Sequence, residues 1–70
     1  MDKFFEAVVA LQEGYQKLVK NKQLTKKAMC DLCIPFRDNY HLTDSQVLRI
    51  ARNEIPLSEL VRIGGAIDAE

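Results

Sequence analysis

The chain has 70 residues, ten basic and ten acidic side chains, and an apolar fraction of 47%. This length allows one domain at most, so we expect a single helical domain over residues 1–70. The balanced charge argues against attachment to nucleic acid or membrane by bulk charge. No run approaches the roughly 18 apolar residues of a membrane span, and Met1-Asp2-Lys3 lacks a signal-peptide leader, so we expect a cytoplasmic protein.

The first predicted helix runs from about Asp2 to Lys20 and carries one continuous apolar stripe. Its members recur at spacings of four and three residues: Phe4, Val8, Leu11, Tyr15 and Leu18. A domain this small buries only about 60% of the surface that its unfolded chain exposes. We therefore expect the stripe to lie partly on the chain itself and partly on a partner or a second copy, as the predicted dimer interface.

Several lysines surround the turn after this helix, and no acidic residue lies between Glu13 and Asp31. The polar segment 21–24 is short enough to join two antiparallel helices. Such a cluster is most often a solvated surface, but it can also orient an acidic partner by electrostatic attraction. We predict this orienting role for the basic patch, which comprises Lys17, Lys20, Lys22, Lys26 and Lys27.

The second predicted helix begins with Thr25 as its N-cap, because a threonine hydroxyl can accept a hydrogen bond from the first helical turn. Further along, Pro35 removes a backbone donor and disfavours helical geometry at Ile34. We therefore expect a kink or a break between Cys33 and Phe36. The long first helix should pack antiparallel on this proline-kinked second helix.

The third predicted helix has the clearest start in the chain. Thr43 and Gln46 have the spacing of a capping box, in which each side chain accepts a hydrogen bond from the backbone of the other residue. Pro56 disfavours helical backbone at the residue before it. This helix should therefore end near Asn53 or Glu54.

A short fourth helix should follow, from about Pro56 or Leu57 to Ile63. Gly64 and Gly65 should end it, because glycine readily adopts the left-handed backbone that closes helices. The apolar residues expected to face the core are Leu57, Leu60, Val61 and Ile67.

Cys30 and Cys33 form a CxxC pair, a spacing shared by half of a zinc site and by redox dithiols. Zinc needs four ligands, and His41 is the only other donor of comparable quality, so we interpret the pair as buried, reduced thiols. His41 has no orienting partner in the pattern and is interpreted as a loop histidine. We find no catalytic constellation, and we expect neither an enzyme nor a cofactor.

An alternative function comes from segment 50–61, which loosely resembles a helix-turn-helix. The usual pattern has an apolar residue three positions after its alanine and then a glycine, whereas Glu54 and Ile55 stand there. The alternative is therefore a small DNA-binding transcriptional regulator that uses the third and fourth helices. Its candidate DNA contacts are Arg49, Arg52, Ser58 and Arg62.

Together these patterns predict an all-α, small three- to four-helix domain with a long N-terminal helix and two short C-terminal helices. The function that they favour is a non-enzymatic regulatory or inhibitory adaptor that docks a protein partner through helical surfaces, as a homodimer. Nucleic acid is the alternative partner, and a membrane is not expected.

Overall fold

The computed structural model describes residues 3–68, which form helices and contain no strand. The helices are α1 (Lys3–Lys20), α2 (Lys26–Tyr40), α3 (Asp44–Ala51) and α4 (Leu57–Asp68). The all-α fold class is therefore confirmed, whereas the helix start predicted at Asp2 lies outside the described residues. None of these helices has both the length and the apolar character needed to cross a bilayer.

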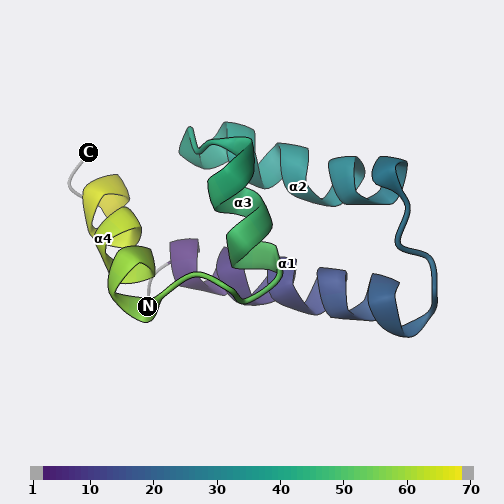
Figure 1. Ribbon diagram of the computed structural model, residues 1–70. Helices are drawn as coiled ribbons and strands as arrows, with labels where there is room; N and C mark the ends of the chain where they lie inside the picture. The colour runs from purple at the N-terminus through teal and green to yellow at the C-terminus, as the bar shows by residue number, and fades with distance from the viewer. Residues whose placement is uncertain (1–2, 69–70) are drawn as a thin grey trace.

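α1 and α2 lie side by side as a helical hairpin (Figure 1). Phe4, near the start of α1, packs its ring against Tyr40 at the end of α2. Gly14, in the second half of α1, faces Leu32 near the middle of α2. The two helices therefore run in opposite directions. α3 packs against both, and α4 lies beside the first turn of α1, where Gly64 approaches Phe4 and Phe5 (Figure 1).

The core centres on Phe4, which is 1% exposed. Its ring centroid lies 5.1 Å from that of Tyr40, 5.4 Å from that of Phe5 and 5.9 Å from that of Phe36. The other buried apolar side chains of the core are Val8, Leu11, Phe36, Val47, Ile50, Ala51, Ile55 and Leu60. Full burial of a large apolar side chain contributes about 1.5–3 kcal/mol. This cluster therefore supplies most of the stabilisation that holds the four helices together.

Both predicted N-caps are confirmed. Thr25 Oγ1 accepts a hydrogen bond from the Ala28 N–H at 3.1 Å. Thr43 Oγ1 accepts one from the Gln46 N–H at 3.1 Å, and Gln46 Oε1 accepts one from the Thr43 N–H at 2.9 Å. The second pair is the expected capping box. These bonds satisfy donors that helix starts leave free, and so they determine where α2 and α3 begin.

The first three helices end on non-glycine residues in left-handed backbone. Their φ angles are 55° at Lys22, 54° at His41 and 58° at Asn53. After each of them the next N–H returns to a carbonyl of the last helical turn, over 2.8–3.1 Å. This closure explains why α3 stops at Ala51, before the predicted Asn53 or Glu54. His41 is the C-cap of α2, a structural role that agrees with a loop histidine.

α2 shows no break at Pro35 and runs without interruption from Lys26 to Tyr40. Pro35 cannot donate a hydrogen bond to the carbonyl of Asp31, four residues earlier. Both residues are exposed, so water can satisfy that carbonyl. Phe36, the next residue, is buried in the core and holds the helix in place. A kink at this point stays a prediction.

α4 is longer than predicted, because it ends at Asp68 rather than at Ile63. Gly64 and Gly65 therefore lie inside the helix instead of ending it. A Cβ atom added to Gly64 would stand 3.1 Å from the rings of both Phe4 and Phe5. The glycine at this position allows α4 to approach α1 closely, and the aromatic contact outweighs its low helix propensity.

The inward face of α4 also differs from the prediction. Leu60 is buried as expected, and Ile67 packs against the core. Leu57 and Val61, however, are 72% and 53% exposed, so their predicted inward orientation is wrong. The helix turns its Gly64 side toward the aromatic rings of α1, which leaves these two residues on its outer side.

The two glycines of α4 should respond oppositely to alanine. Gly65→Ala should raise the free energy of unfolding of the monomer by about 1 kcal/mol, because glycine costs roughly that in a helix and nothing in the same chain lies within 4 Å of the added Cβ. Gly64→Ala should lower it by about 1 kcal/mol, because crowding two aromatic rings costs about 1–3 kcal/mol. Urea unfolding followed by circular dichroism measures both. An equal gain in the free energy of unfolding for the two variants would contradict the close α1–α4 contact.

Candidate functional site

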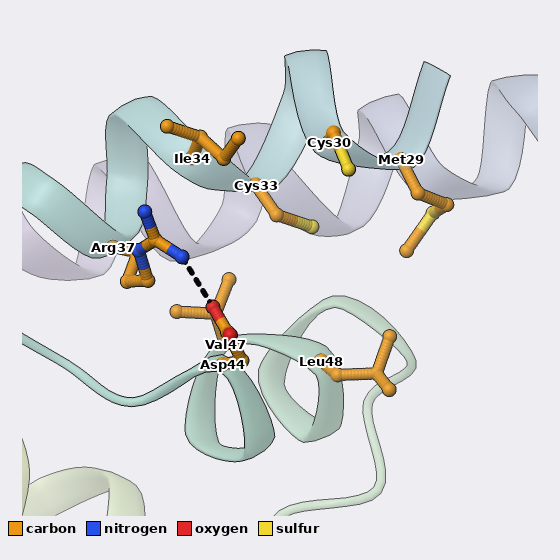
Figure 2. Close-up of a pocket in the computed structure, with 8 residues that line it drawn as sticks. All are labelled: Met29, Cys30, Cys33, Ile34, Arg37, Asp44, Val47 and Leu48. Carbon is orange, nitrogen blue, oxygen red and sulfur yellow. Dashed lines mark hydrogen bonds and ion pairs between the residues drawn. The ribbon is translucent and has the colours of Figure 1, made fainter. Parts of the chain in front are cut away.

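An open groove lies between α2 and α3 (Figure 2). Its cavity has a volume of about 230 Å³. At one end, Arg37 donates a hydrogen bond to Asp44 at 2.5 Å, and the rest of the lining is largely apolar. We call it the α2–α3 groove, lined by Met29, Cys30, Cys33, Ile34, Arg37, Asp44, Val47 and Leu48.

The α2 wall of the groove follows from helical spacing. Met29 and Cys33 are four residues apart, as are Cys30 and Ile34, so their side chains project from neighbouring turns on one side of the helix. Ile34 is 40% exposed. On the opposite wall, half-buried Leu48 extends outward beside buried Val47. Accessible apolar side chains in a concave setting can receive an apolar group from another molecule.

The two cysteines of the groove differ in environment. Both are free thiols, with Cys30 exposed and Cys33 half-buried, so the expectation of two buried thiols is wrong for Cys30. The turn of the helix explains this, since Cys30 lies farther round from the core than Cys33. Burial raises the pKa of the Cys33 thiol, and the nearby Cys30 and Asp44 raise it further. Cys33 is therefore a protonated thiol at neutral pH.

The zinc site considered from the sequence does not assemble. Residues 3–68 contain no group of three His, Cys, Asp or Glu side chains placed to hold a metal ion. His41 caps the C-terminal end of α2, whereas Cys30 and Cys33 lie in its middle turns. Their separation along the helix keeps the imidazole away from the two thiols.

The α1 stripe lies mostly inside the monomer. Phe4, Val8 and Leu11 are buried by the chain's own helices, while Tyr15 and Leu18 are half-buried. The first three, which were predicted as members of the dimer interface, therefore form part of the intramolecular core. A stripe of this kind has the same sequence pattern whether its own chain or a second one covers it.

The basic patch surrounds the turn between α1 and α2, and all its lysines are exposed. Within residues 3–68 none of them forms an ion pair. Lys26 lies four residues before Cys30, one turn away on the same side of α2. The basic patch therefore adjoins one end of the α2–α3 groove.

The four candidate DNA contacts lie on α3, α4 and the turn between them. Arg49 is ion-paired with Glu59 of α4, and Arg52 is the C-cap of α3. Ser58 and Arg62 are exposed on α4. The pairing of Arg49 places an acidic side chain beside the basic one, which weakens the attraction for phosphates. Contact with DNA through these residues stays a prediction.

Two surface features were missed by the sequence reasoning. One is the α2–α3 groove. The sequence signal for it was the wide apolar arc of α2, on which Leu32 and Phe36 face the core. Met29 and Ile34 extend this arc to the side of the helix that lines the groove. The other is the outer side of α4, which we call the α4 strip and which comprises Leu57, Val61 and Gly65. An apolar arc too wide for one neighbouring helix indicates surface left uncovered.

Comparison with known proteins finds no family model, no curated protein and no solved structure that matches this chain. We therefore argue its function from three features of the molecule itself. These are the α2–α3 groove, the basic patch and the α4 strip.

The two thiols should be alkylated at different rates. With limiting iodoacetamide near neutral pH, Cys30 should react at least about fivefold faster than Cys33, because Cys33 is half-buried and the raised pKa keeps it as the unreactive thiol. As the pH is raised, Cys33 should begin to react with iodoacetamide only above the range in which an ordinary thiol ionises. Peptide mass spectrometry measures both sites, and urea should equalise them. Equal rates in the folded chain would contradict this assignment.

Proposed function

We propose that this chain is a non-enzymatic regulatory or inhibitory adaptor that docks onto a partner protein through a helical surface. The observation that supports it best is the α2–α3 groove, an apolar concavity of about 230 Å³ between two helices. Grooves of this kind bind the apolar face of a partner helix. We place the role in the cytoplasm, where the free thiols of Cys30 and Cys33 remain reduced.

The segment that docks is an amphipathic helix with acidic residues beside its apolar face. Charge complementarity supports this occupant, because the exposed Lys26 and Lys27 adjoin the groove and form no ion pair within residues 3–68. Unpaired surface lysines accelerate the encounter with an acidic partner and orient it. Apolar anchors inside the groove then supply most of the affinity.

Self-association is the second part of this proposal, and the α4 strip is the accessible surface for it. In an antiparallel pair of α4 helices centred on Val61, Leu57 of one copy lies opposite Gly65 of the other. A large side chain then meets the smallest one, which is the self-complementarity that a two-fold interface requires. The open space around Gly65 accommodates such an approach, since nothing lies within 4 Å of a Cβ added there.

Docking should depend on both the groove and the basic patch. A displayed library of helical peptides, selected on the full chain, should yield peptides with acidic residues flanking an apolar face. Ile34→Glu should weaken their binding at least about tenfold, because a buried anchor at an interface is worth more than about 1–2 kcal/mol. Lys26→Glu combined with Lys27→Glu should slow association and reduce its salt dependence. Surface plasmon resonance measures both effects.

Val9→Glu is the matched control for Ile34→Glu. Val9 is an apolar side chain of comparable exposure, 51% against 40%, but it lies on α1, outside the groove. Its replacement should leave peptide binding unchanged. Equal losses in the two variants would refute the groove as the docking site. If neither substitution changed peptide binding and the chain bound duplex DNA with steep salt dependence, the result would instead support the transcriptional regulator.

The α4 strip should control the oligomeric state. Sedimentation analysis should give a particle of twice the 8.0 kDa chain mass for the unmodified protein. Leu57→Lys combined with Val61→Lys should give the monomer without loss of helix content, because both side chains are exposed. Leu18→Lys, on the half-buried end of the α1 stripe, serves as the comparison and should leave the dimer intact. A monomer in the unmodified protein at about 100 μM would exclude self-association of useful strength.

A further inference from the structure

Three sulfur atoms are gathered on the α2 wall of the groove. Met29 and Cys30 are adjacent residues of α2, Cys33 lies about one turn further along, and all three line the same cavity. Figure 2 shows their side chains on the side of α2 that faces α3. Cys30 and Cys33 are three residues apart, so their side chains project from the same side of α2. Neither docking nor self-association requires sulfur at these positions.

Two thiols and a thioether form a soft donor set. Such ligands favour copper(I), whereas magnesium and calcium prefer oxygen and structural zinc prefers four ligands. Within residues 3–68 no further His, Asp or Glu joins the two cysteines to complete a four-ligand site. Copper(I) differs from zinc because it is stable with only two or three sulfur ligands. We propose that Met29, Cys30 and Cys33 bind one copper(I) ion per chain.

The charge balance of this site agrees with its surroundings. Binding of one copper(I) ion displaces one proton from each thiol to solvent, so the ion and two thiolates together carry one negative charge. Lys26 lies one turn before Cys30 on the same side of α2, and Arg37 lies one turn after Cys33. Lys26, which forms no ion pair within residues 3–68, stabilises the anionic centre electrostatically, whereas Arg37 is already paired with Asp38 and Asp44. No change in the oxidation state of copper or sulfur is involved.

Most of the remaining groove residues suit a copper(I) centre, and the carboxylate of Asp44, which also lines the groove, is engaged by Arg37. Ile34, Val47 and Leu48 are aliphatic side chains without donor atoms, and they line the cavity beside the sulfurs. They supply no oxygen or nitrogen ligand that would favour copper(II) or zinc. Met29 has an unbranched, flexible side chain, so its thioether can adjust to an ion held by the two thiolates. This site does not depend on partner docking and is measured without a partner.

The test is an anaerobic titration of the reduced full chain with copper(I), supplied as its acetonitrile complex in competition with bicinchoninate. We expect the protein to withdraw one equivalent of copper per chain from the coloured chelate. Cys30→Ser and Cys33→Ser should each weaken binding more than about 100-fold, since loss of an outer-shell partner alone costs 10–100-fold. Met29→Leu should weaken it about tenfold, and X-ray absorption should detect sulfur as the only ligand type.

Val9→Ala is the control, because it alters an exposed apolar side chain outside the groove and removes no donor. It should leave copper binding unchanged, and circular dichroism checks that each variant is folded. Cys30 is exposed, so Cys30→Ser keeps the test valid even if Cys33→Ser destabilises the helix. No copper withdrawn, one copper per two chains, or binding that survives Cys30→Ser would each overturn the proposed site. Unchanged affinity in Met29→Leu would overturn the three-ligand assignment.

Discussion

The packing of Phe4 is the contact on which the arrangement of the helices depends. Its ring meets Phe36 and Tyr40 of α2, and α4 reaches it through Gly64, where no side chain intervenes. One residue of α1 therefore joins three of the four helices. In so short a chain, which buries a modest share of its surface, a central aromatic contact of this kind has a disproportionate effect on stability.

The packing of α1 into the core determines which surfaces of the molecule remain available for binding. Since Phe4, Val8 and Leu11 are enclosed by their own chain, the apolar stripe of α1 holds the monomer together and is not available as a whole to a partner. Uncovered apolar surface remains in the α2–α3 groove and in the α4 strip. α3 begins beside Arg37 of α2 and runs toward α1, so it covers only part of α2 and leaves the α2–α3 groove open.

The helix starts could be predicted from the sequence because they depend on local chemistry. The capping box of Thr43 and Gln46 involves residues three apart, and it needs no knowledge of the rest of the fold. The end of α4 could not be predicted in this way. Left-handed backbone at Lys22, His41 and Asn53 closes the first three helices, while Gly64 serves packing against Phe4 and Phe5. A glycine pair marks a helix end or a close contact, and only the tertiary structure distinguishes them.

The candidate site shows the same division between local and tertiary information. The CxxC spacing already placed Cys30 and Cys33 on one side of a helix, but their exposure depends on how α3 crosses α2. Asp44 at the start of α3 contacts Arg37 of α2, whereas Ile50 near its end accepts a hydrogen bond from Gln12 of α1. α3 therefore runs from α2 toward α1, and only its first turns line the groove (Figure 1). The accessibility of both the apolar anchors and the sulfur donors follows from this crossing, which a sequence pattern within α2 alone does not contain.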